Sequence, residues 1–262
     1  MKYFNDYYPY ASNLSSMFYM QDYFAVRYLK QNNIIPDNSV FIPGFSGDML
    51  AGSHLLPSMK NILKKRKIAE LIFAQYFGLI KTDKKKKSEA IAQISNQLPE
   101  ENCETWKVVE SWDLKERQAK FVVNSSKIFS YFGYDYVMPF WDNQLIDFFS
   151  GLPFHLKLNK KLYDHVLTEV IFKQYNLNFK NEINVLPIQK RVQRIKEKLK
   201  TFIPDYIINI FVQRSCPVLY DKITELMIAD LGPGSFVPPR QANVYNSYIT
   251  QWYLLKTKEF LF

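Results

Sequence analysis

One short stretch of the sequence concentrates residues that could hold a ligand against the backbone. Residues 38–54 read NSVFIPGFSGDMLAGSH and contain Gly44, Gly47 and Gly52, three of the 8 glycines in the chain, with one acid, Asp48. Glycine has no Cβ, so the backbone at such positions can approach another group closely. The stretch therefore predicts a loop whose backbone lies close to another group. Asp48 is either a ligand-binding carboxylate or an ordinary turn acid that bonds its own backbone.

The element expected before this loop is a short buried strand. Residues 39–43, SVFIP, form a β-branched and aromatic run of the kind that makes a buried parallel strand. Pro36 and Asp37 end the helix expected over residues 15–33. The loop then follows the carboxyl end of the strand, which is the edge where open α/β sheets bind ligands. Because a lone strand leaves its ladder groups unpaired, we expect a further strand-bearing segment to precede it.

After His54 the pattern is helical almost throughout, so the sequence predicts an α/β protein that is predominantly helical. Pro- and Gly-rich residues 231–240, LGPGSFVPPR, predict a connecting loop before the last helix. The helices are expected near residues 60–80, 86–97, 103–132, 142–150, 160–174, 188–200, 204–213, 218–230 and from about 241 onward.

The net charge of +9 invites a nucleic-acid interpretation, because Lys and Arg gain affinity by releasing counterions from phosphates. The basic runs, NILKKRK, the four lysines of residues 84–87 and QKRVQRIKEKLK, lack the interleaved aromatics of a base-stacking surface. We therefore expect solvated basic faces and no specific nucleic-acid partner. A basic helical protein that binds nucleic acid is the alternative. The same charge favours an anionic substrate such as a nucleotide.

Membrane and cysteine signals are weak. No stretch approaches the 18 or more apolar residues of a membrane span, and the first ten residues, MKYFNDYYPY, lack a signal-peptide core. We expect a cytoplasmic protein that does not bind membranes. Cys103 and Cys216 lie far apart without metal-ligand spacing, so both are expected to be inert thiols.

Two motifs carry a resemblance to a known family. PGFSGDMLAGSH resembles the Gly-rich loop of the asparagine synthetase-type synthetase domain, usually Gly-x-Gly-Ala-Asp-Glu-Leu-Phe-Gly-Gly-Tyr, with Gly44, Asp48, Leu50 and Gly52 in register. Residues 132–172, FGYDYVMPFWDNQLIDFFSGLPFHLKLNKKLYDHVLTEVIF, resemble a second block of that family. The matching residues of the second block are Pro139, Phe140, Asp142, Leu145, Phe148, Leu152, Pro153, Leu156 and Leu158. The order and spacing of the two motifs also match the family. The resemblance covers roughly residues 20–200.

The resemblance implies an ATP pyrophosphatase that adenylates a small carboxylate and then forms an amide. It implies ATP and Mg²⁺ as cofactors and the carboxyl-terminal portion of an adenine-nucleotide alpha-hydrolase-like (PP-loop) synthetase domain. Residues 1–55 would be a remnant of the nucleotide-binding sheet, and residues 56–262 the helical part. The family's Ser-Gly-Gly-x-Asp-Ser phosphate loop does not occur here. The expected partner is therefore an N-terminal PP-loop half or a glutaminase chain.

The resemblance also assigns site residues. Asp48 matches the family acid that shares Mg²⁺, which typically takes one or two carboxylates plus phosphate oxygens and waters. Gly44, Ser46 and Gly47 would contact the nucleotide. Lys190, in VLPIQKRVQRIK, is the candidate for stabilising charge that develops on the adenylate and pyrophosphate, with Arg191 second; the alternative is a solvated basic helix face.

Several positions depart from the family pattern. Met49 replaces the Glu after the metal-binding Asp, Phe45 replaces the loop Glu, and Val137 replaces an Arg. These losses leave open a degenerate, non-catalytic relative that binds a nucleotide or a protein partner. Asp135 matches a family acid or is an exposed turn acid. Asp142 is expected to cap the helix that follows it.

Overall fold

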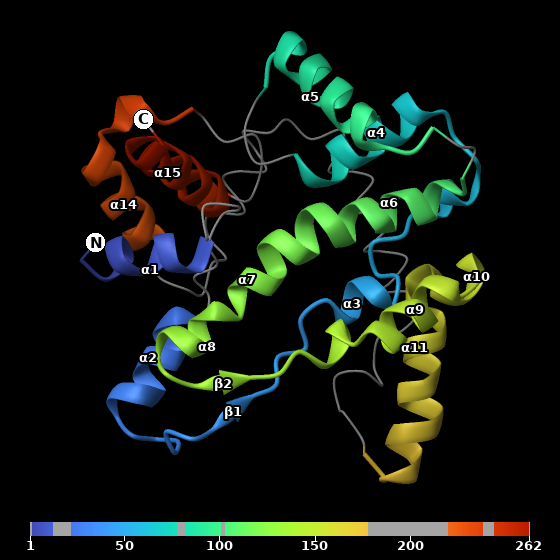
Figure 1. Ribbon diagram of the computed structural model, residues 1–262, viewed down its shortest axis with the longest axis horizontal. Helices are drawn as coiled ribbons and strands as arrows, with labels where there is room; N and C mark the ends of the chain where they lie inside the picture. Colours follow the sequence, from blue (N-terminus) through green and yellow to red (C-terminus); the bar gives the residue numbers. More distant parts are fainter. Residues whose placement is uncertain are drawn as a thin grey trace, which may run out of the picture. The chain divides into compact units, whose positions relative to one another are not determined.

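A computed structural model of the chain describes residues 2–12, 22–77, 82–100, 103–177, 220–237 and 244–261. Over these residues the protein is mostly helical with a small parallel sheet (Figure 1). Contacts group residues 1–75, 84–164 and 257–262 into one compact unit and residues 76–83 and 165–256 into another. The division at residue 55 that the family resemblance implies stays a prediction.

The elements of the first unit carry the Gly-rich loop and its described contacts. In chain order they are α1 (Lys2–Ser12), α2 (Tyr23–Gln31), β1 (Val40–Phe41), α3 (Gly47–Leu50), η1 (Pro57–Lys60), α4 (Lys65–Tyr76), α5 (Lys84–Gln97), α6 (Thr105–Asp113), the π-helical η2 (Leu114–Val122), α7 (Val123–Ser125), α8 (Lys127–Tyr131), β2 (Asp135–Tyr136), η3 (Pro139–Trp141), α9 (Asn143–Gly151), α10 (Phe154–Lys157), η4 (Leu158–Lys160) and α11 (Lys161–His165).

The second unit contains further helical segments. They are the π-helical η5 (Val166–Phe172), α14 (Tyr220–Leu231), η6 (Pro233–Ser235) and, up to residue 256, α15 (Val244–Leu261). Within this unit the Trp252 indole donates a hydrogen bond of 2.8 Å to the Asp230 carboxylate, and the Lys256 ammonium lies 3.1 Å from the same oxygen. These contacts join α14 to α15.

The predicted strand at residues 39–43 is present in part, as β1, and it has a partner in this chain. β1 pairs in parallel with β2, placing Val40 opposite Asp135 and Phe41 opposite Tyr136; the two strands lie side by side in Figure 1. The expectation that β1 would be unpaired without a preceding segment is therefore wrong. With only two residues, β2 is too short for an alternating pattern to reveal it.

The loop after β1 and the turn after β2 share a small core. Met49 and Leu50 of α3 are buried with Phe149 of α9. Beside them, the ring of Phe140 in η3 lies so close to Gly47 that a Cβ there would be 2.7 Å from it. The two segments that carry the family resemblance are thus in contact.

Most expected helices are present, with boundary shifts. α4, α5, α9 and α14 lie in or near their predicted ranges, α2 lies within residues 15–33, and residues 105–131 form the run from α6 to α8. Asp142 caps α9 as predicted, because its Oδ1 accepts a hydrogen bond of 3.0 Å from the Leu145 amide. The helices predicted at 188–200 and 204–213 lie outside the described residues.

One helix was not expected from the sequence. α1 contains Pro9 and is rich in tyrosine, so its composition is poor for a helix. Its buried residues Tyr7, Tyr8 and Ala11 instead indicate that tertiary packing stabilises it. In the part of the chain that the structure describes, no helix has the length and apolar character needed to cross a membrane.

Candidate functional site

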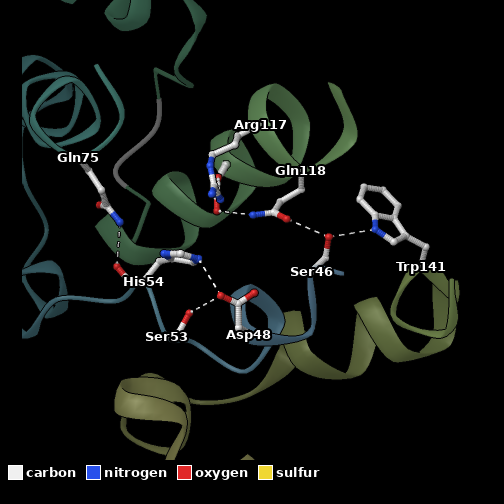
Figure 2. A network of polar contacts seen from close by, with 9 residues as sticks. Ser46, Asp48, Ser53, His54, Gln75, Arg117, Gln118 and Trp141 are labelled. Atoms are coloured by element: carbon white, nitrogen blue, oxygen red, sulfur yellow. Dashed lines mark hydrogen bonds and ion pairs between the residues drawn. The ribbon is translucent and has the colours of Figure 1, made fainter. Parts of the chain in front are cut away.

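The Gly-rich loop turns at Ser46, which is held in the left-handed region of backbone conformation (φ 69°) directly before α3. Such a conformation is strained for a residue with a Cβ and persists only when its surroundings enforce it. Here the buried Ser46 hydroxyl donates to Gln118 Oε1 at 2.9 Å and accepts from Trp141 Nε1 at 3.1 Å (Figure 2). The hydroxyl is thus bonded to the protein and fixes the loop.

Gln118 continues this network into the long helical run. Its amide donates to Asp113 Oδ2 at 3.3 Å, and the Arg117 guanidinium lies 3.7 Å from Asp113 Oδ1. Gln118 and Asp113 are five residues apart. The i→i+5 winding of η2 brings residues at that spacing to the same side of the helix. The sequence pattern did not indicate this network, because its periodicity predicts an ordinary α-helix.

Asp48 points to the outside of the loop. Its side chain is 66% exposed, and its Oδ2 lies 3.5 Å from His54 Nε2. The Ser53 hydroxyl donates to the same oxygen at 3.4 Å (Figure 2). The hydrogen bond from His54 is the largest cause that lowers the pKa of Asp48 to about 2, and Ser53 adds to it. Asp48 is therefore ionised at neutral pH and open to a ligand.

The backbone of His54 is held by a residue of α4. The Gln75 amide donates to the His54 carbonyl oxygen at 3.2 Å (Figure 2). The residue that stands at the family's Tyr position thus serves as a hydrogen-bonding partner of Asp48. The sequence pattern did not predict this contact.

The three loop glycines are not equivalent. Gly52 has φ +95°, and a Cβ there would lie 2.4 Å from the backbone carbonyl oxygen of Lys157. A Cβ at Gly47 would meet the ring of Phe140, whereas none of the described residues lies within 4 Å of a Cβ at Gly44. Gly47 and Gly52 are thus required by packing within the protein, while Gly44, among the described residues, borders open space.

A buried ion pair lies behind the loop. Lys157 Nζ is 2.7 Å from Glu110 Oε2 of α6, and the two side chains are 2% and 15% exposed. Burial raises the pKa of Glu110, and this effect outweighs the attraction of the Lys157 ammonium. Glu110 Oε1 is also buried and has no hydrogen-bond partner among the described residues. The sequence pattern did not identify either residue.

The structure describes only some of the remaining predicted site residues. Lys190 and Arg191 lie outside the described residues, so the catalytic role of Lys190 stays a prediction. Asp135 lies in β2 and pairs with β1. Across the described ranges, no group of three or more His, Cys, Asp or Glu side chains could hold a metal ion.

Comparisons with known proteins give no match: no family model fits the chain, and no curated protein or solved structure matches it. Function is therefore argued from the geometry and chemistry of the site.

Proposed function

We propose that this chain is the carboxyl-terminal part of an asparagine synthetase-like, ATP-dependent ligase, with residues 44–52 forming one side of a Mg·ATP site. One observation carries the proposal: the two segments with the family resemblance are in contact. The first segment follows β1 and the second contains β2, and these two strands pair in parallel. After the strands, Gly47 of the first segment packs against Phe140 of the second. The carboxyl ends of adjacent parallel strands are a usual location of ligand sites in α/β folds.

Asp48 is suited to be a Mg²⁺ ligand at such a site. It is exposed and ionised, and Mg²⁺ commonly takes one carboxylate while substrate phosphates and waters supply its other ligands. Bound there, Mg²⁺ would neutralise charge on the departing pyrophosphate. In the proposed reaction a substrate carboxylate attacks the α-phosphorus of ATP and displaces pyrophosphate. An amine then displaces AMP to give the amide. Lys190 would stabilise the developing charge.

A second candidate function is supported by Met49. This residue stands where the family has a Glu, and it is buried in the core with Leu50 and Phe149. No carboxylate can act from that position. The burial favours a non-catalytic relative that binds a nucleotide or a protein partner.

A pyrophosphate-release assay separates the two candidates. The purified chain would be supplied with ATP, Mg²⁺, a small carboxylic acid and ammonia, with and without a separate protein that bears the Ser-Gly-Gly-x-Asp-Ser half. The ligase proposal predicts no release from the chain alone and release from the mixture. It also predicts that Asp48→Asn lowers the rate at least about tenfold, which corresponds to about 1.4 kcal/mol.

Asp37→Asn is the matched control, because Asp37 is also an exposed acid with a basic partner, Lys30, but lies before the strand. Its rate should equal that of the unmodified chain. A mixture that gains thermal stability without releasing pyrophosphate would support the non-catalytic relative. Release from the chain alone would contradict the proposal that the loop is one side of the site.

A further inference from the structure

The ion pair of Glu110 and Lys157 joins α6 to the end of α10. The Lys157 ammonium is enclosed between the Glu110 carboxylate, at 2.7 Å, and the ring of Trp106, whose centroid is 5.5 Å away. A pair this deeply buried gains little over apolar packing, because both charges must be removed from water. Stability alone is thus a weak reason for charged residues at these two positions.

The backbone of Lys157 touches the end of the Gly-rich loop. The carbonyl oxygen of Lys157 fills the space in which residue 52 would carry a Cβ. One residue therefore contacts the loop through its main chain and α6 through its side chain. The position of Gly52 depends on where the ion pair holds Lys157.

The beginning of the loop is tied to the same helical run. Ser46 bonds Gln118 of η2, which directly continues α6. The loop is thus held near both ends against α6 and η2. In the sequence Asp48 lies between these two attachments, and its side chain is exposed.

We propose that Glu110 and Lys157 are positioning residues: their ion pair fixes the end of the Gly-rich loop and thereby the direction in which Asp48 presents its carboxylate. The proposal rests on the proposed function only where it names Mg·ATP as the ligand of Asp48. Glu110 Oε1 has no hydrogen-bond partner among the described residues, so the carboxylate is held through Oε2. Loss of the ammonium would release Lys157 and, with it, the contact to Gly52.

The first test measures the loop in the full chain without nucleotide. The chain has 3 histidines, so the ring nitrogen signals of His54 can be assigned by NMR with a His54→Gln variant. Lys157→Met should shift the His54 signals and speed amide exchange over residues 46–53 at least about tenfold. Lys67→Met is the control, because Lys67 pairs with Glu70 at the same 2.7 Å but is 67% exposed. It should change neither quantity.

Two further variants separate positioning from stability. Glu110→Met combined with Lys157→Met replaces the pair by apolar side chains, so its thermal midpoint should recover while the loop signals stay shifted. Lys157→Arg keeps a cation that can bond a carboxylate and should keep the loop signals near those of the unmodified chain. If the double variant restores both the midpoint and the loop signals, the pair only stabilises the fold and the proposal is overturned.

A Mg·ATP titration, with the Ser-Gly-Gly-x-Asp-Ser half present, connects the loop to the ligand. The double variant should bind at least about tenfold more weakly than the unmodified chain. Equal affinities would overturn the proposal. If the unmodified chain binds no Mg·ATP but the loop signals still shift in the variants, the proposed function fails and the positioning role stands.

Discussion

Asp48, within the Gly-rich loop, and Glu110, in α6 behind it, are two acids that each have a basic partner. The partner of Asp48 is His54 at 3.5 Å, and that of Glu110 is Lys157 at 2.7 Å. The pKa of Asp48 is nevertheless lowered to about 2, whereas that of Glu110 is raised. Burial makes the difference, because desolvation disfavours the charged form. The exposed acid is available to a ligand, while the buried acid holds the structure.

The largest expected effect is the loss of the buried pair's cation. Lys157→Met should lower the free energy of unfolding by about 3–5 kcal/mol, because it leaves the Glu110 carboxylate buried without its partner. The measurement is urea-induced unfolding followed by circular dichroism. For the exposed pair, His54→Gln should cost less than about 1 kcal/mol. Equal losses in the two variants would show that burial does not distinguish the pairs.

A smaller effect is expected when the contact between loop and Lys157 is disturbed from the loop side. Gly52→Ala should cost at least about 2 kcal/mol, since the left-handed conformation alone costs roughly 1–2 kcal/mol and the new Cβ also meets the Lys157 carbonyl. Gly44→Ala should stay within about 0.5 kcal/mol, because no residue in the described part of the chain lies near its Cβ. The same unfolding measurement compares them. If Gly44→Ala lowers the free energy of unfolding as much as Gly52→Ala does, the tight contact is not specific to Gly52 and the prediction is wrong.

The smallest expected effect is that the contributions of Asp48 and Glu110 to stability change differently with pH. Asp48 has a lowered pKa, so its stabilising contribution is present above pH 4 and is lost as the pH falls from about 4 to about 2. Asp48→Asn should therefore lower stability by at most about 1 kcal/mol near neutral pH, with the difference vanishing near pH 2.

Glu110 should show the opposite slope. Its raised pKa means that the folded state binds its proton more tightly than the unfolded state, so its contribution to stability falls as the pH rises above its unfolded pKa. Unfolding curves of Glu110→Gln and Asp48→Asn, measured from pH 2 to 7 against the unmodified chain, should diverge in opposite directions. If the two variants show the same pH dependence of stability, the opposite pKa shifts of Asp48 and Glu110 are contradicted.

The sequence predicted the local features of the site better than its long-range contacts. The strand before the loop and the cap at Asp142 were readable because short segments encode them. β2 was missed because two residues cannot show a period. Glu110 and Lys157 were missed because each looks like a surface residue in its own segment, and only their contact across 47 residues makes them a buried pair.

The geometry of the loop adds one finding that composition could not supply. Three glycines in nine positions predicted close approach of the backbone to a ligand. In the folded chain, Gly47 and Gly52 instead approach Phe140 and Lys157, while Gly44 borders open space among the residues that the structure describes. The glycine signal was informative about tight contact but did not identify the group in contact, since protein and ligand place the same demand on a missing Cβ.

The π-helical winding of η2 makes the site sensitive to chain length as well as to side-chain chemistry. Gln118 reaches Ser46 and Asp113 together because this segment is wound more widely than an α-helix. An α-helix brings residues four apart to one side, whereas this segment does so for residues five apart. After deletion of a single residue between Leu114 and Gln118, Gln118 would face Ser46 only if the segment returned to α-helical winding. The loop therefore depends on the length and winding of this segment, even when every side chain of the network is still encoded.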